Sequence, residues 1–114
     1  MQRLHVREVL LNILQNAREA LNGAGLIYIR ALCRSDLSIE VVIRDNGPGI
    51  PKEKLVQVFE PYYTTKERGT GLGLAIVKQN MELYGGTVTI ESELGKGACF
   101  TLLFPAKSLI RFSK

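Results

Sequence analysis

The chain has 114 residues, 46% of them apolar, which suits one compact domain (residues 1–114) with a single core. A net charge of +4, without any cluster of lysine and arginine, argues against a nucleic-acid-binding protein. No apolar run is long enough to span a membrane and the N-terminus lacks the layout of a signal peptide, so we expect a cytoplasmic domain without direct membrane contact.

The first predicted element is a helix over residues 5–22. Its apolar residues recur at helical spacing and mark one buried face, and two glycines, Gly23 and Gly25, follow it. The residues of this face are Val6, Val9, Leu10, Ile13, Ala17 and Leu21.

Strands and two further helices complete the pattern. Residues 26–33 and 37–45 are rich in β-branched side chains and predict an antiparallel hairpin. Residues 51–59 predict a short second helix, residues 72–84 a third, and residues 87–92 and 98–105 a closing hairpin. The predicted fold is α+β, a two-layer α/β sandwich with helices on one face of a largely antiparallel sheet.

The two cysteines, Cys33 and Cys99, stand singly inside predicted strands and lack metal-ligand spacing. We therefore expect reduced core residues, with a structural disulfide as the alternative.

Three polar residues follow one edge of the first helix. Asn12, Asn16 and Glu19 have i, i+4, i+7 spacing, which places them within a narrow arc. Amide and carboxylate oxygens are hard donors that suit Mg²⁺ beside phosphate oxygens. The alternative is a hydrated polar face.

Asp45 ends the second predicted strand, and residues 46–49 (NGPG) must then turn the chain. A carboxylate in this position is able to accept a hydrogen bond from an exocyclic amine, such as that of adenine. The alternative is an ordinary turn that ends a strand.

Three glycines, Gly69, Gly71 and Gly73, lie directly before the third helix. They fit neither the dinucleotide fingerprint nor the P-loop pattern. Unpaired N–H groups at a helix start nevertheless suit an anion such as phosphate, and the alternative is a glycine-rich turn.

Four segments, in chain order, carry a family resemblance. They are "NILQNAREA", "DNGPGI", "FEPYYTTK" and "GTGLGLAIV", and they resemble the N, G1, F and G2 boxes of sensor histidine kinase catalytic domains. These domains share a superfamily with gyrase, MutL and the heat-shock chaperone ATPases. The resemblance covers residues 4–105 and implies a Bergerat-type fold, with a mixed, mostly antiparallel sheet and about three helices on one face. It also implies an ATP pocket between the first helix, the third helix and a lid.

The resemblance assigns roles to the polar positions. Asn16 resembles the Mg²⁺ ligand and Asn12 its neighbour near the phosphates, and both join Lys66 as catalytic candidates. Asp45 resembles the residue that binds the adenine amine. The other nucleotide-binding positions that it implies are Glu19, Ala20, Gly47, Gly49, Ile50, Phe59, Thr65, Lys66, Gly69, Thr70, Gly71, Leu72, Gly73, Leu74 and Thr101.

Departures from the family pattern narrow the expected activity. Gyrase-like relatives carry a water-activating glutamate where this chain has Asn12, which favours transfer to a protein over hydrolysis. Many members have Lys-Tyr where this chain has Glu19 and Ala20, and Ala98 replaces the usual threonine. His5 lacks the sequence context of a phosphoacceptor, and the family's first strand is missing upstream of Leu4.

The expected function is therefore that of a catalytic domain within a larger sensor kinase. It would transfer the γ-phosphoryl group of Mg-ATP to a histidine on a helical dimerisation domain, with a response regulator downstream. The alternatives are an anti-sigma-type serine kinase and a nucleotide-sensing module without transfer activity.

Overall fold

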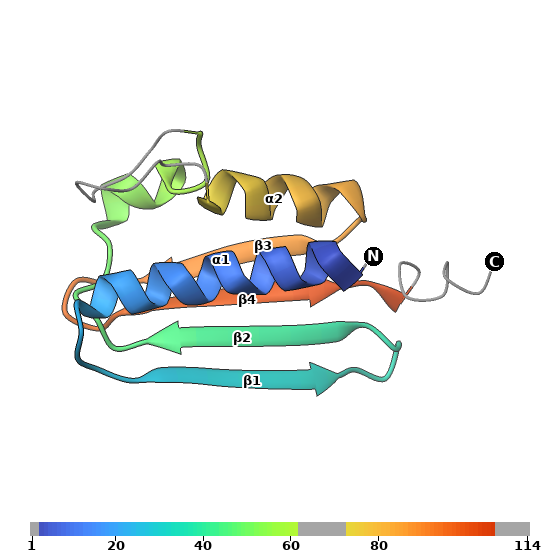
Figure 1. Cartoon of the computed structure of the whole chain (residues 1–114), viewed down its shortest axis with the longest axis horizontal. Coiled ribbons are helices and arrows are strands. Elements are labelled where there is room, and N and C mark those ends of the chain that lie inside the picture. Colours follow the sequence, from blue (N-terminus) through green and yellow to red (C-terminus); the bar gives the residue numbers. More distant parts are fainter. Residues whose placement is uncertain (1–2, 62–72, 107–114) are drawn as a thin grey trace.

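The computed structural model describes residues 3–61 and 73–106. Figure 1 shows two layers, with helices on one face of a sheet. In chain order the elements are α1 (Arg3–Leu21), β1 (Ile27–Cys33), β2 (Ile39–Asp45), the 3₁₀ helix η1 (Lys52–Gln57), α2 (Gly73–Leu83), β3 (Thr87–Ser92) and β4 (Ala98–Phe104).

The sheet has the strand order β1-β2-β4-β3, and each neighbouring pair is antiparallel. Both hairpins predicted from the sequence are present, and β4 joins them by pairing with β2. The structure confirms the α+β two-layer sandwich. The short helix predicted within residues 51–59 is present as a 3₁₀ helix of six residues.

The core lies between α1, α2 and the inner face of the sheet. Val9, Ile13 and Ala17 of the predicted α1 face are buried, and Val6, Leu10 and Leu21 are half-buried. The core cluster consists of Val9, Ile13, Val41, Ile43, Val77, Met81, Phe100, Leu102 and Phe104. Neither helix of the described part is long and apolar enough to cross a membrane.

The outer strand β1 is exposed on both faces, because α1 packs against β2 rather than β1. Cys33, the last residue of β1, is exposed, so the prediction that it belongs to the core is wrong. Cys99 is half-buried on β4, and both cysteines are free thiols.

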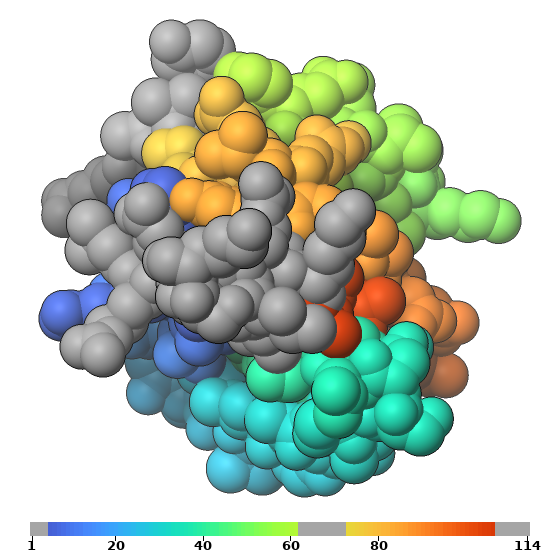
Figure 2. Space-filling view, turned by 90° about the vertical axis from the view of Figure 1, so that its right-hand side faces the viewer, coloured from blue at the N-terminus to red at the C-terminus, as the bar shows by residue number. Residues whose placement is uncertain are grey.

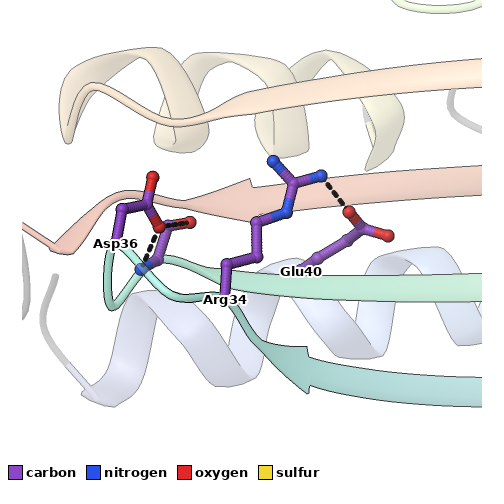
Figure 3. A network of polar contacts seen from close by, with 4 residues as sticks. Arg34, Asp36 and Glu40 are labelled. Carbon is purple, nitrogen blue, oxygen red and sulfur yellow. Dashed lines mark hydrogen bonds and ion pairs between the residues drawn. The ribbon is translucent and has the colours of Figure 1, made fainter.

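The turn between β1 and β2 is held by a small polar network (Figure 3). The Oδ1 atom of Asp36 accepts the backbone N–H of Ser38 at 2.9 Å and the Ser38 hydroxyl at 2.6 Å. Arg34 forms an ion pair with Glu40 beside it. The turn lies at the surface, at the end of the molecule that is on the right in Figure 1 and faces the viewer in Figure 2 (teal). The two hydrogen bonds from Ser38 lower the pKa of the Asp36 carboxyl below its usual value of 3.8.

The first prediction concerns the pH dependence of this turn. A carboxyl whose pKa is lower in the folded state stabilises that state above its unfolded pKa and loses the contribution as the pH falls through the folded pKa. An Asp36→Asn variant should therefore be less stable than the wild type at neutral pH. Denaturant unfolding should show this difference shrinking once the pH falls below 3.8. A difference that stayed constant down to strongly acidic pH would contradict the assignment.

The second prediction concerns the close approach of the β3–β4 turn to β2. A Cβ atom on Gly97 would lie 2.0 Å from the carbonyl oxygen of Asp45, whereas a Cβ on Gly95 would have no heavy atom within 4 Å. The two glycines have nearly equal positive φ angles of 80° and 83°. Gly95→Ala should cost about 1–2 kcal/mol of folding free energy for its left-handed backbone alone. Gly97→Ala should cost clearly more, and equal losses in urea unfolding would show that the close approach does not matter.

Candidate functional site

The C-terminal ends of β2 and α1 lie at the same end of the molecule as the N-terminal end of α2 (left in Figure 1). Gly73, the first residue of α2, lies beside Asn12 of α1, because a Cβ on Gly73 would be 3.7 Å from the Asn12 side-chain oxygen. A Cβ on Gly47 would lie 3.2 Å from the Ala20 carbonyl oxygen. Three of the four sequence segments therefore meet at this end.

Asp45 is a buried acid, with 2% of its surface exposed. Its Oδ1 atom accepts the backbone N–H of Gly47 at 2.9 Å. Within residues 3–61 and 73–106, no second donor to this carboxylate is found. A buried carboxylate normally satisfies more of its acceptor capacity, so the remaining capacity suits a ligand that donates an N–H.

The turn after Asp45 is fixed on two sides. Asn46 donates its backbone N–H to the Leu26 carbonyl at 3.3 Å, and its side-chain oxygen accepts the Leu26 N–H at 2.8 Å. The Gly95 N–H binds the Pro48 carbonyl at 2.8 Å. The position of the carboxylate is therefore set by β1 and by the β3–β4 turn.

A close contact with the β3–β4 turn requires glycine at position 49, and this requirement was not predicted from the sequence. Its φ is 79°, and a Cβ there would lie 2.1 Å from the Glu93 carbonyl oxygen. Next to it, the Ile50 N–H donates to the Ser92 hydroxyl at 2.8 Å, and that hydroxyl donates to the Gly97 carbonyl at 2.7 Å. Gly97 also belongs to this cluster but was not predicted as a site residue, although the segment "GKG" indicated a glycine-dependent turn at this position.

The polar edge of α1 forms the second part of the site. Asn12 and Asn16 are half-buried, while Glu19 is exposed and accepts a hydrogen bond from Gln15 at 3.3 Å. The start of α2 faces Asn12, and the first N–H groups of a helix lack intrahelical acceptors. The Asn12 side-chain oxygen and the first N–H groups of α2 therefore lie close together, an arrangement that suits a phosphorylated ligand.

Phe59 is half-buried against the core. Its ring packs edge-on to Phe100 with 6.3 Å between centroids, and Lys78 of α2 lies with its Nζ 6.0 Å from the ring centre. Phe59 is thereby tied to both β4 and α2. Leu74 also packs against the core.

Thr101 requires a correction. It pairs with Val42 and Thr89, whereas the residues of β4 that face the helices are Ala98, Phe100, Leu102 and Phe104. Strand side chains alternate between faces, so Thr101 points away from the side that carries Asp45. The predicted contact with adenine does not fit this orientation. Ala98 lies on the inner face instead.

Several predicted positions lie outside the described residues, namely Thr65, Lys66, Gly69, Thr70, Gly71 and Leu72. A possible metal site must be judged from the remainder. Among the described residues, no group of three His, Cys, Asp or Glu side chains could hold a metal ion. Asn16 as a Mg²⁺ ligand stays a prediction from the resemblance, with phosphate oxygens and water as the other ligands.

Comparison with known proteins identifies the family of the chain. Residues 1–108 match the family described as histidine kinase-, DNA gyrase B-, and HSP90-like ATPase. Sensor histidine kinase ZraS of Escherichia coli (strain K12) is 43% identical over 98 residues, which are 86% of this chain and 21% of that protein. Sporulation kinase C of Bacillus subtilis (strain 168) is 39% identical over 103 residues, 90% of this chain and 24% of that protein. The chain thus spans less than a quarter of the length of either relative.

Solved structures show the same fold. The nucleotide-free catalytic domain of the histidine kinase ThkA has a TM-score of 0.81 at 35% identity, covering 92% of this chain and 68% of that one. The mycobacterial sensor histidine kinase MprB has a TM-score of 0.83 at 29% identity, covering 92% of this chain and 74% of that one.

Proposed function

Because the chain belongs to the family of histidine kinase-, DNA gyrase B-, and HSP90-like ATPases, we propose that it is the catalytic domain of a sensor histidine kinase. In this proposal, residues 1–114 act as one domain that binds Mg-ATP in the cytoplasm. The domain transfers the γ-phosphoryl group to a histidine on a separate helical dimerisation domain, and a response regulator acts downstream. The observation that carries the proposal is the buried Asp45 carboxylate, with acceptor capacity left over, at the end of the molecule that holds the C-terminal end of α1 and the start of α2.

Asp45 would hold the adenine end of the nucleotide. Its free acceptor capacity matches the exocyclic amine of adenine, which donates two hydrogens. Gly47 lies against the Ala20 carbonyl beside it, and Ile50 is half-buried nearby in sequence. A base with a carbonyl oxygen in place of the amine would instead face the carboxylate with a second acceptor.

The phosphates would lie between the α1 edge and the start of α2. Asn16 would hold Mg²⁺, which neutralises charge on the phosphate oxygens when it is bound. Asn12 would contact phosphate, and the N–H groups at the start of α2 would bind phosphate oxygens. As the resemblance implies, Thr65, Lys66 and the glycines Gly69, Gly71 and Gly73 would contribute to phosphate binding as well.

Asn12 supports transfer over hydrolysis. An amide cannot take a proton from water as a glutamate does, so this position supplies no general base. The nucleophile would be the imidazole nitrogen of the acceptor domain. That nitrogen forms a bond to the γ-phosphorus while the bond to the β–γ bridging oxygen breaks, and ADP leaves.

The third prediction tests the adenine end. Asp45→Asn should weaken ATP binding by about 1–3 kcal/mol, because it removes the charge from a buried acceptor while its oxygen still suits the Gly47 N–H. Calorimetry in the presence of Mg²⁺ measures this loss. Asp36→Asn is the matched control, since it makes the same change in the distant β1–β2 turn and should leave ATP affinity unaltered. Equal affinity of Asp45→Asn and the wild type would remove Asp45 from the nucleotide site.

The fourth prediction concerns the acceptor. The chain's single histidine, His5, forms a hydrogen bond between its Nδ1 atom and the Tyr84 hydroxyl at 2.7 Å. It lies seven residues before Asn12 on the same helix, a distance of about 10 Å at 1.5 Å per residue. The isolated chain should therefore bind ATP without labelling itself from radiolabelled ATP.

Label should appear when a helical hairpin with an acceptor histidine is supplied, and it should be acid-labile and base-stable. Acid-stable label would favour the serine-kinase alternative, and ATP binding without any transfer would favour the nucleotide-sensing module. Label on the isolated chain that disappears in His5→Gln would make His5 the acceptor.

A further inference from the structure

We propose that Glu8 and Asn80 are positioning residues, whose hydrogen bond sets the register of α2 along α1 and so holds the start of α2 against Asn12. This inference rests on the proposed function, because it concerns the phosphate end of the same site. Neither residue belongs to the four sequence segments that carry the family resemblance.

The polar edge of α1 extends beyond the residues that were predicted from sequence. His5, Glu8 and Asn12 follow i, i+3, i+7 spacing, which at about 100° per residue puts them on the same side of the helix. Asn16 and Glu19 continue this side toward the C-terminal end of α1. One continuous polar stripe therefore runs along α1.

The first half of this stripe is paired with α2. The Nδ2 atom of Asn80 donates to the Glu8 Oε1 atom at 2.9 Å. One turn further out, His5 and Tyr84 form their hydrogen bond, with ring centroids 5.5 Å apart. These contacts run in opposite order along the two helices, so α1 and α2 pack antiparallel.

The second half of the stripe begins where α2 begins. Gly73, the first described residue of α2, lies against Asn12. His5 and Glu8 form the part of the stripe that is bonded to Tyr84 and Asn80, and Asn12 and Asn16 form the part that the proposed function assigns to the nucleotide. The boundary between the two parts lies at Asn12.

Apolar packing alone does not fix this division. Val77 and Met81 of α2 lie in the core with Val9 and Ile13 of α1, and burial of this kind is non-directional. A hydrogen bond with fixed geometry favours the register in which its donor and acceptor meet, and this one lies at the exposed edge of the contact between α1 and α2. Together with the His5–Tyr84 pair, the Glu8–Asn80 pair distinguishes the observed register from one in which α2 has shifted along α1, and it is the pair nearer to Asn12 and Gly73.

A shift of α2 would affect transfer more than binding. The adenine end depends on Asp45 and the turn after it, which are held by β1 and the β3–β4 turn rather than by α2. The phosphate end depends on the distance between Asn12 and the start of α2. Misplacement by about 1 Å is enough to cost about 100-fold in a reaction that relies on positioning.

The test compares Asn80→Ala and Glu8→Ala with Gln79→Ala, a matched control at the exposed neighbouring position of α2. Asn80→Ala and Glu8→Ala should each lower kcat for transfer to an acceptor hairpin by about 10- to 100-fold. Their ATP dissociation constants should change by less than about threefold, because the contacts at Asp45 remain. Glu8→Gln keeps an acceptor oxygen for Asn80 and should restore most of the rate. The double variant Glu8→Ala/Asn80→Ala should be no slower than either single variant, because both changes remove one contact.

A second readout does not require activity. Nuclear Overhauser contacts between the Asn12 side-chain amide and the Gly73 α-protons should be strong in the wild type and in Gln79→Ala, and weak in Asn80→Ala. If the wild type showed no transfer at all, the proposed function would fail while this contact still tested the register. Unchanged contacts in Asn80→Ala, or equal losses of kcat in Glu8→Gln and Glu8→Ala, would overturn the positioning role.

Discussion

The site depends on the way one face of α1 is buried against the sheet. Val9, Ile13 and Ala17 are almost fully removed from solvent, and each large apolar side chain buried in this way contributes about 1.5–3 kcal/mol. This burial fixes the rotation of the helix about its own axis. Once that rotation is set, the part of the polar stripe from His5 to Asn12 has to lie along the flank that faces α2. In the proposed function, the helix is a structural element on one side and a ligand-binding edge on the next.

Burial of the apolar face of α1 stabilises the fold, whereas burial of the Asp45 carboxylate costs free energy. A carboxylate with 2% exposure loses most of its hydration, and the described residues return one hydrogen bond to it. Such a cost is typical of functional positions, where a ligand supplies the missing partner. The glycines around it make this arrangement possible, because Gly47, Gly49 and Gly97 each lie where a Cβ would meet neighbouring atoms. The buried position of Asp45 therefore depends on the close backbone contacts that these glycines allow.

Much of this arrangement could be predicted from sequence. The α1 face follows from helical spacing, the strands from β-branched runs, and the place of Asp45 from its position before a glycine turn. The misses have physical causes. β1 is apolar on both faces although it is an outer strand, so its pattern suggested burial for Cys33. β4 has apolar residues on both faces, so alternation alone did not show that Thr101 points outward. Glu8 and Asn80 are 72 positions apart and belong to no motif, and their contact emerges only when α1 and α2 pack together.

The preference of the nucleotide site between purine bases is the decisive measurement, because the proposed function requires a buried carboxylate that recognises the amine of adenine. Calorimetry with Mg²⁺ should compare ATP with ITP, which differs by a carbonyl oxygen in place of that amine. ATP should bind at least about tenfold more tightly, as expected for loss of a hydrogen bond to a charged group. Equal affinities for ATP and ITP would contradict it, since a carboxylate that faces the base cannot accept a hydrogen bond from that carbonyl oxygen.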